Sequence, residues 1–493
     1  TALAPECTKG LATYLNVSND TFEPTKMVDD DIALIILNAV KRHDVELYEQ
    51  IKEGIEDERI TRFFNRHEMQ YEVLNEFLKK SAPNASHLRA YQMARGILNK
   101  YVLPKIKGTI DILPVHRGMH MRKIFSNMKA SAGACRYGRS KEDEQELIIS
   151  IALDLLANPT DPGLPALCFH RAQISGYVKN GKLSPETIKY KDRLVWCVDA
   201  ATVMVEGIFA RPLMNYIIPS IPNYAGGKSE REINQWMQRW RKGKYYLCID
   251  YSGYDSTVPY WVIKDMFELL KQYFKPELHS IMDDIRRRFI NMSILMPDGK
   301  IYTKHKGIPS GSYFTQIIGS LVNAQIILTY ICKWKNFDET EVLAELRDHE
   351  DYNILTFMAM GDDNVLFTIN KIDIKDLSSY CKEVFGVKIE VESGKIDQGE
   401  IAGEAPKFLK REWTINGAYR EPLELLLYAI HPERWRSYDN YSPWHILYGY
   451  YLTYRATMSR YFTEREILEG MANSEFGIGA LVHVKLRDLP GSL

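Results

Sequence analysis

Apolar residues in the first part of the chain recur at the spacing of an α-helix. Between residues 31 and 105 they are interspersed among charged residues, as Leu34, Ile35 and Ala39 illustrate. Residues 142–157 begin with acidic side chains, which the helix dipole favours in a first turn, and continue into a largely apolar run. Both segments are therefore predicted to be helical.

Shorter apolar runs, bounded by acids and turn residues, follow from residue 245 onward. Residues 245–250 have the composition of a strand and end on an acid, Asp250. Residues 354–360 and 365–369 are apolar runs joined by Gly-Asp-Asp-Asn. This second pattern predicts a β-hairpin with acids at its tip.

Two further segments are typical of helix beginnings. Residues 256–259, Ser-Thr-Val-Pro, combine a hydroxyl cap with an early proline. Residues 307–312, Gly-Ile-Pro-Ser-Gly-Ser, form a turn-rich loop that leads into an apolar stripe from Ile317 to Leu328. We therefore expect a helix after each of these segments.

The composition is that of a globular protein. The 493 residues are 45% hydrophobic and 26% charged, with a formal net charge of -1, which excludes collagen-like, low-complexity and wholly disordered chains. At roughly 150 residues per domain we expect about three subdomains, packed on one another because no long linker separates them. No apolar run approaches the ~20 residues that cross a bilayer, so we expect no membrane span. The opening residues 1–5 lack the features of a secretory signal.

Cysteine usage and charge balance narrow the classes further. Seven cysteines are scattered without a Cys-x-x-Cys pair, which indicates free thiols in a reducing compartment. With 63 Lys and Arg against 64 Asp and Glu, the composition alone does not identify a nucleic-acid-binding protein. If the chain binds RNA, its basic groups must gather on one surface.

Three aspartates at strand ends or turns suggest metal chemistry. Asp250, Asp362 and Asp363 would raise one another's pKa if they met, and a divalent cation would relieve this repulsion. Two such ions roughly 4 Å apart can activate a hydroxyl and neutralise a departing pyrophosphate. The alternative is that Gly-Asp-Asp is only a turn and Asp250 only a cap. That alternative weakens because the hairpin, the strand-ending acid and the Ser-Gly loop occur together.

The order and wording of these segments resemble those of viral RNA-dependent RNA polymerases. Asp250-x4-Asp255, Gly307-x2-Ser310-Gly311-x3-Thr315 and Gly361-Asp362-Asp363 resemble motifs A, B and C of that family. Residues 307–316 are most similar to polymerases of the partitivirus type, with picobirnaviruses as relatives. Flanking segments resemble motif G (127–133), motif F (191–195), motif E (408–411) and the thumb (423–434).

The resemblance implies an α+β right-hand polymerase of fingers, palm and thumb, with an RRM-like antiparallel palm sheet. A largely helical N-terminal region would close the fingers onto the thumb. The implied boundaries are 1–120 (N-terminal region), 121–243 (fingers), 244–275 (palm), 276–303 (fingers insertion), 304–411 (palm) and 412–493 (thumb).

The resemblance also implies a reaction. The chain would replicate and transcribe a viral double-stranded RNA genome by nucleotidyl transfer with two Mg²⁺ or Mn²⁺ ions. Asp250, Asp362 and Asp363, together with the backbone carbonyl of Tyr251, would hold the ions. We expect a lysine between motifs C and E to protonate the pyrophosphate, with Lys395 as the first choice and Lys388 as the alternative.

Basic residues are expected to bind phosphates. Lys191 and Arg193 alternate along an extended segment, so both point to one side and could grip a triphosphate, although a paired surface strand is the alternative. The resemblance assigns RNA contacts to Ser131 and Gly133 of motif G and to Lys410 and Arg411 of motif E. The arginine-rich segments 239–244 and 286–288 are weaker candidates for contact with the RNA backbone.

Four further polar residues and Gly311 are assigned to the nucleotide. Reverse transcriptases place a bulky aromatic where this chain has Asp255, whose oxygens can accept from a ribose hydroxyl, and Ser310 and Thr315 can complete the network. Ser310 and Gly311 could equally form an ordinary helix cap. Many related polymerases have an asparagine where this chain has Gly319. Asn323 is then a nucleotide-binding candidate, with a structural role in the palm as the favoured alternative.

The implied partners are template RNA, nascent RNA, NTPs and viral capsid protein, with no membrane. The implied location is the virion interior and the host cytoplasm. Two other functions stay open from the sequence. One is a reverse transcriptase, which Asp255 argues against. The other is a non-catalytic, capsid-associated RNA-binding protein that retains a polymerase fold.

Overall fold

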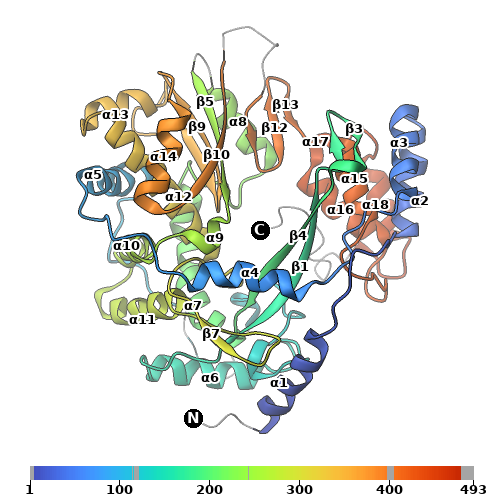
Figure 1. Ribbon diagram of the computed structural model, residues 1–493, viewed down its shortest axis with the longest axis horizontal. Helices are drawn as coiled ribbons and strands as arrows, with labels where there is room; N and C mark the ends of the chain where they lie inside the picture. Colours follow the sequence, from blue (N-terminus) through green and yellow to red (C-terminus); the bar gives the residue numbers. More distant parts are fainter. Residues whose placement is uncertain (1–4, 114, 116–120, 242–243, 397–404, 479–493) are drawn as a thin grey trace. The chain divides into compact units, whose positions relative to one another are not determined.

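The computed structural model describes residues 5–113, 115, 121–241, 244–396 and 405–478 (Figure 1). The chain forms two compact units, and it passes between them several times. Unit 1 comprises Thr1–Ser18, Glu72–Phe169 and Val195–Leu409, and unit 2 comprises Asn19–Tyr71, His170–Leu194 and Lys410–Leu493. The predicted N-terminal region 1–120 is therefore divided between the two units.

Unit 1 is built around an antiparallel sheet of four strands in the order β10-β5-β9-β8. The strands are β5 (Tyr245–Ser252), β8 (Phe357–Met360), β9 (Asp363–Thr368) and β10 (Lys388–Lys395). The central strands are almost wholly buried, which explains why their sequences read as apolar runs. Helices α12 (Thr315–Trp334) and α14 (Ile374–Phe385) pack against the sheet, and α10 (Tyr260–Lys271) packs on α12 (Figure 1).

The predicted hairpin with acids at its tip is confirmed. β8 and β9 pair from Phe357 to Met360, and Met360 faces Asp363 across a two-residue turn formed by Gly361 and Asp362. Gly361 has a φ of 56°, a left-handed conformation that glycine adopts without steric cost. The glycine therefore explains why the chain reverses at this point and presents its acids at the tip.

Helix α12 is the core helix of unit 1. It is long and apolar enough to cross a membrane by length and composition, but 89% of its apolar window is buried inside the protein. Helix α5 (Arg89–Ile97) lies against it. Continuous apolarity in this segment thus reflects burial on all sides rather than one amphipathic face.

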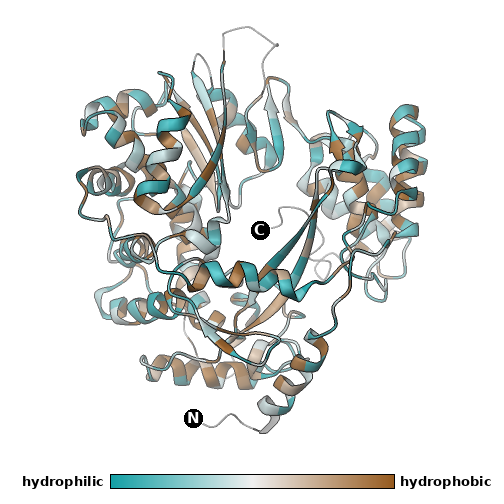
Figure 2. Cartoon of the chain, viewed as in Figure 1, coloured by the Kyte–Doolittle hydropathy of each residue, from teal (hydrophilic) through white to brown (hydrophobic). Residues whose placement is uncertain are grey.

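The remaining helices of unit 1 surround this core. The predicted helix at 142–157 begins slightly later, as α6 (Gln145–Ala157), and it is apolar along most of its length (Figure 2). The others are α1 (Pro5–Ser18), α7 (Ala200–Tyr216), α8 (Glu230–Trp240), α9 (Tyr254–Thr257), α11 (His279–Ile290) and α13 (Glu339–Leu346). A second sheet contains β4 (Lys189–Cys197), β1 (Ala166–Ser175), β6 (Ser293–Leu295) and β7 (Ile301–Thr303), in that order.

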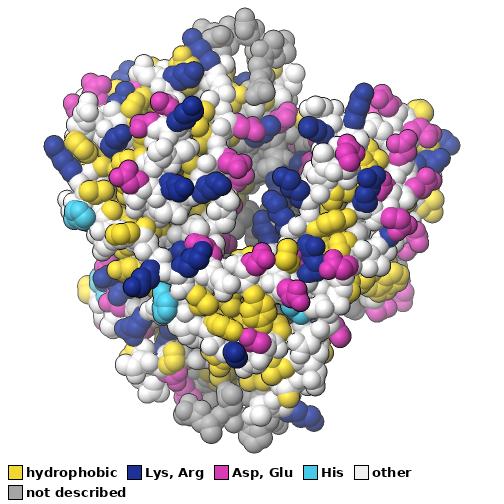
Figure 3. Space-filling view, viewed as in Figure 1, with side chains coloured by type: hydrophobic (Ala, Val, Ile, Leu, Met, Phe, Trp, Pro, Cys, Tyr) yellow, Lys and Arg dark blue, Asp and Glu magenta, His cyan; other side chains and the backbone are white. Residues whose placement is uncertain are grey.

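Unit 2 joins N-terminal and C-terminal helices in one core. Its helices are α2 (Asp30–Lys41), α3 (Val45–Glu56), α15 (Pro422–Ile430), α16 (Pro443–Thr453), α17 (Arg455–Met458) and α18 (Glu464–Ala472), with the start of α4 (His67–Leu78). Helix α15 packs on α2 and α3, and a Cβ atom at Gly54 would come within 2.7 Å of Leu427. Charged side chains of both signs are interspersed on the outer surface of these helices (Figure 3). The predicted thumb therefore shares its core with residues from the N-terminal region.

Candidate active site

The sheet of unit 1 brings the three predicted aspartates together. β5 pairs with β9 up to Ile249 opposite Asn364, so Asp250 follows next to Asp363 at the end of the ladder. Asp362 occupies the adjoining hairpin turn. Asp250 and Asp362 are exposed, whereas Asp363 is partly buried. Acids more than 110 positions apart in sequence thus meet at one edge of the sheet.

The electrostatic environment of Asp363 combines burial with two acidic neighbours. Burial, with the neighbouring Asp362 and Asp250 carboxylates, raises the pKa of Asp363 to about 7, although the Leu409 amide donates a hydrogen bond of 2.7 Å that opposes the shift. Like charges gathered in this way favour a bound cation. The donor set therefore fits hard divalent ions such as Mg²⁺ or Mn²⁺. Across the described residues, no three His, Cys, Asp or Glu side chains are already gathered tightly enough to hold an ion.

Asn323 is a structural centre of this sheet edge. Its Nδ2 donates to the carbonyls of Gly361 (3.0 Å) and Asp363 (3.2 Å), and its Oδ1 accepts from the Tyr251 hydroxyl (3.0 Å). The side-chain amide of Asn364 donates a fourth hydrogen bond, of 3.1 Å, to Oδ1 of Asn323. Asn323 is fully buried and these bonds use its amide, which favours the structural alternative, and nucleotide binding by Asn323 stays a prediction.

Tyr251 also faces inward. Its side chain is buried, and burial raises its pKa well above the ordinary value, with the charges of Cys381 and Asp362 adding to the shift. The hydroxyl therefore remains protonated and donates to Asn323. The role of the Tyr251 backbone carbonyl as a metal ligand stays a prediction.

The loop at 307–315 docks against the turn that carries Asp255. The Ile308 amide donates to the Asp255 carbonyl at 2.7 Å. Gly307 has a φ of 81°, and a Cβ atom there would lie only 2.4 Å from the same carbonyl oxygen. A glycine is thus required for the close approach. The Asp255 residue itself is exposed on the short helix α9.

The middle of this loop is hydrogen-bonded to β4 and packs closely against it. The Trp196 amide donates to the Ser310 hydroxyl at 3.0 Å, and a Cβ atom at Gly311 would lie 1.9 Å from the Trp196 carbonyl. Thr315 donates its hydroxyl proton to the Pro309 carbonyl at 2.6 Å. Ser310 therefore keeps a proton to donate to a ligand, whereas Thr315 retains only acceptor capacity.

Two buried charged residues that the sequence analysis missed hold the ends of the loop. The Lys304 ammonium donates to the carbonyls of Ile290 (2.7 Å) and Gly307 (3.0 Å), and burial lowers the pKa of Lys304 well below its ordinary value. Glu206 on α7 accepts from the Ser312 hydroxyl and from the Tyr313 amide. Burial raises the pKa of Glu206 to about 7. The sequence signal for Glu206 is an acid inside an otherwise apolar helical segment.

The predicted motif G residues, Ser131 and Gly133, lie in a segment that packs beside Asp199, the residue that precedes α7. Gly133 has a φ of 82°, and a Cβ atom there would be 2.9 Å from the Cα atom of Asp199. Asp199 is buried and accepts from the Cys135 amide at 2.9 Å, while the Ser131 hydroxyl accepts from the Gly133 amide at 3.1 Å. These contacts explain the conformation of the segment. RNA contact by Ser131 and Gly133 stays a prediction.

The two lysines considered as proton donors lie at opposite ends of β10. Glu390 is the cross-strand neighbour of Asp250, and Lys388 is paired with Ser252 close by. Lys395 is paired with Tyr245. It lies about 17 Å along the strand from Glu390, the neighbour of Asp250, at 3.3 Å per residue. Strand alternation also turns Lys395 to the opposite face from Glu390. The described conformation therefore brings Lys388, the alternative choice, to the aspartates and does not bring Lys395 there.

Unit 2 carries the predicted phosphate-binding residues. Lys191 and Arg193 are both exposed on β4, and Asp192 between them pairs with His170 and Arg66, which confirms the alternation. Lys410 is an exposed residue. Desolvation by the surrounding protein, with the Arg420 and Arg193 cations, lowers the pKa of Lys410 to about 8.

The Arg411 side chain makes contacts within unit 2. Its guanidinium lies 4.2 Å from the ring centre of Tyr454 and donates to the Thr453 carbonyl at the end of α16. These contacts give Arg411 a structural role in unit 2. Its predicted contact with RNA remains untested.

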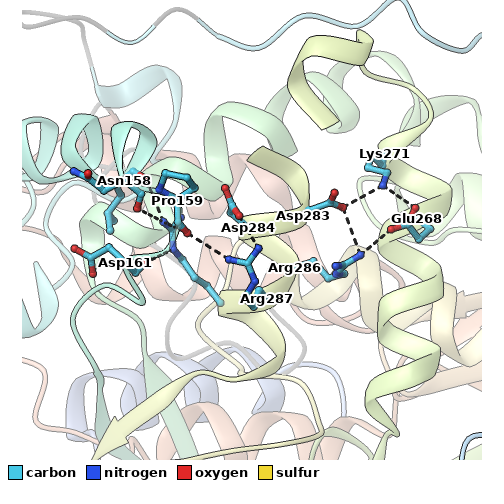
Figure 4. Close-up of polar contacts among 11 residues, drawn as sticks. Asn158, Pro159, Asp161, Glu268, Lys271, Asp283, Asp284, Arg286 and Arg287 are labelled. Carbon is cyan, nitrogen blue, oxygen red and sulfur yellow. Dashed lines mark hydrogen bonds and ion pairs between the residues drawn. The ribbon is translucent and has the colours of Figure 1, made fainter. Parts of the chain in front are cut away.

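The arginine triplet 286–288 is committed to internal contacts (Figure 4). Arg286 pairs with Glu268 at 2.7 Å, and Arg287 pairs with Asp284 at 2.8 Å. Arg288 is buried and donates to the carbonyls of Asp161 (2.8 Å) and Leu155 (3.2 Å), which closes the end of α6. The triplet therefore joins helices and does not present a free basic surface.

In the other arginine-rich segment, 239–244, of which residues 242–243 lie outside the described part of the chain, Arg239 and Lys244 also make internal contacts. Arg239 bonds to Asp348 at 2.5 Å, and the buried Lys244 donates to the Arg347 carbonyl at 2.9 Å. Neither segment supports the weaker suggestion of RNA-backbone contact.

Comparisons with known proteins agree with this geometry. A family model described as viral RNA-dependent RNA polymerase matches residues 174–426. The RNA-directed RNA polymerase of Cryptosporidium parvum virus 1 is 32% identical over 188 residues, which are 36% of this chain and 32% of that protein. The corresponding protein of Atkinsonella hypoxylon virus is 30% identical over 129 residues, 25% of this chain and 18% of that protein. The matched segments thus span a third or less of these curated relatives.

A solved structure shows the fold. The crystal structure of the RNA-dependent RNA polymerase of a human picobirnavirus superposes with a TM-score of 0.62 at 14% identity, covering 95% of this chain and 89% of that one. The predicted α+β polymerase fold with an antiparallel palm sheet is therefore confirmed. Because the family model also matches just over half of the sequence, the chain belongs to the viral RNA-dependent RNA polymerase family.

Proposed function

We propose that this chain is an RNA-directed RNA polymerase that replicates and transcribes a viral double-stranded RNA genome. The observation that carries the proposal is the meeting of Asp250, Asp362 and Asp363 at one sheet edge, beside the loop that begins at Gly307. A turn acid and a strand acid with merely local roles would not need to converge in this way.

The three aspartates are the residues that would hold divalent ions. Two bound Mg²⁺ or Mn²⁺ ions would supply charge that lowers the pKa of an attacking 3′-hydroxyl and neutralises the departing pyrophosphate. Asp250 and Asp362 are exposed and supply the accessible carboxylates. The Leu409 amide fixes one oxygen of Asp363 and so orients the third acid.

Other side chains are assigned to the substrate. Lys191 and Arg193 bind the triphosphate of the incoming NTP, since both side chains are exposed on one side of β4. Lys388 donates a proton to the leaving pyrophosphate, because it is the described lysine of β10 near Asp250. Asp255 and Ser310 bind the nucleotide sugar.

The partners follow from the resemblance to partitivirus-type polymerases. They are template RNA, nascent RNA, NTPs and viral capsid protein, and the location is the virion interior in the host cytoplasm. The named dsRNA-virus relatives support the genome type.

The proposal is tested by extension of a defined RNA template, with and without a primer, in the presence of Mg²⁺ or Mn²⁺. We expect NTP incorporation by the wild-type chain and none after chelation of divalent ions. Asp362→Asn should abolish incorporation, whereas Asp439→Asn, an exposed acid in unit 2, should not. Incorporation of dNTPs in preference to NTPs would instead identify a reverse transcriptase, and equal activity of wild type and Asp362→Asn would contradict the proposal.

A further inference from the structure

One face of α12 runs along the catalytic hairpin. Gln316, Gly319, Ser320 and Asn323 stand at i, i+3, i+4 and i+7, which places them on the same side of the helix. The Ser320 hydroxyl accepts from the Gly361 amide at 2.8 Å, and Asn323 donates to the Gly361 carbonyl at 3.0 Å. This helix face therefore follows the turn that carries Asp362.

Gln316 differs from the other polar members of this face. Its amide lies against the hairpin turn, since a Cβ atom at Gly361 would be 3.0 Å from Oε1 of Gln316. That oxygen is buried, and within the described part of the chain no donor reaches it. The polar atoms of Ser320 and Asn323, in contrast, all have hydrogen-bond partners, and each side chain makes at least one bond to the hairpin backbone. The face thus contains one buried amide oxygen without a donor among the described residues, and it belongs to the residue nearest the loop.

Three positions near Gln316 offer the sugar no free side-chain donor. Gly319 has no side chain, Asn323 is committed to the palm, and Thr315 donates to the Pro309 carbonyl. The Tyr254 hydroxyl donates to the Gly319 carbonyl, so the turn that contains Asp255 borders the same space. The helix face that carries Gln316 therefore contacts both the Asp255 turn, through Gly319, and the catalytic turn.

We propose that Gln316 is a specificity-determining residue that hydrogen-bonds the ribose 2′-hydroxyl of the incoming nucleotide. This inference rests on the proposed polymerase function. A primary amide both donates and accepts, and a hydroxyl does the same, so the two groups are complementary. A buried acceptor without a partner is unfavourable, and binding of a ribonucleotide would satisfy it. A 2′-deoxynucleotide would leave it unpaired, which disfavours DNA precursors.

The test compares NTP and dNTP use by wild type and Gln316→Met on one defined template. Methionine keeps the length of the side chain but offers no amide. We expect kcat/KM for the NTP to fall by about two- to tenfold, as is typical for loss of one neutral hydrogen bond, while kcat/KM for the matching dNTP stays unchanged. The ratio of the two values should fall accordingly.

Gln325→Met is the matched control, because Gln325 lies on the same helix but donates to the Tyr91 carbonyl on another side. It should leave the NTP-to-dNTP ratio unchanged. A second variant, Gln316→Asn, shortens the amide and should also lower the ratio, which covers a folding defect specific to methionine. An unchanged ratio in both Gln316 variants, with or without a general loss of rate, would overturn the inference. If wild type incorporates no NTP, the proposed function fails first, so the two failures are distinguishable.

Discussion

The catalytic hairpin and the arginine-rich helix α11 use charged residues in opposite ways. At the hairpin, Asp250 and Asp362 are exposed and like-charged neighbours crowd Asp363. On α11, Arg286 and Arg287 are matched to acids, and Arg288 is buried among carbonyls. Acids gathered at the end of a sheet therefore indicate chemistry, whereas arginines paired with acids and carbonyls on a helix indicate packing.

The largest expected effect is at the sheet edge. Asp250→Asn should reduce RNA synthesis about a thousandfold or more, because several kcal/mol of charge stabilisation in the transition state are lost. Its melting temperature should stay close to that of wild type, since Asp250 is exposed. Steady-state extension rates and thermal unfolding measure the two quantities. If Asp250→Asn kept its activity, the acids at the sheet edge would not carry the chemistry, and the contrast with the paired arginines of α11 would not hold.

The next effect separates the two lysines of β10. Lys388→Met should lower kcat by about a hundredfold, as loss of a general acid does. Lys395→Met should stay within about threefold of wild type, because Lys395 pairs with Tyr245 at the far end of the strand. The reverse result would show that the β10 segment rearranges when substrate binds.

Helix α11 should respond in stability. Arg288→Ala removes the donor to the Asp161 and Leu155 carbonyls and should lower the free energy of unfolding by about 2–4 kcal/mol. Arg287→Ala breaks an exposed pair and should change it by less than about 1 kcal/mol. Denaturant unfolding of both variants measures these values. Intact stability of Arg288→Ala, with weaker RNA binding, would restore the triplet as an RNA contact.

The smallest effect concerns pH. Because burial raises the pKa of Glu206 to about 7, its contribution to stability is full at pH 4 and is lost as the pH rises toward 7. Glu206→Gln cannot ionise, so its free energy of unfolding relative to wild type should improve by about 1–2 kcal/mol between pH 5 and about pH 6.5. Unfolding curves at the two pH values provide the comparison. A constant difference between the proteins would show that Glu206 does not titrate in this range.

Much of the site could be predicted from sequence because its signals are local. Apolar runs on both sides of Gly-Asp-Asp predict the hairpin, and an acid at the end of the apolar run 245–250 marks Asp250 as a candidate site residue. Gly307 and Gly311 could be placed in a loop, and the structure supplies the reason, which is close approach to the Asp255 and Trp196 carbonyls.

The rest depends on contacts between distant segments. Glu206 and Lys304 look like ordinary charged residues until folding buries them against the loop. Asn323 could not be separated from a ligand-binding residue without knowing that four of its bonds go to the palm. The sharing of one core by α3 and α15 could not be predicted either, because no local pattern links them.

Direct ion binding tests the central claim that the three aspartates form one divalent-metal site. Mn²⁺ titration of the folded protein, followed by calorimetry or electron paramagnetic resonance, should show binding in wild type that is strongly weakened in both Asp250→Asn and Asp362→Asn. The Asp439→Asn protein should bind as wild type does. Equal Mn²⁺ affinity in wild type and in both sheet-edge variants would contradict the account.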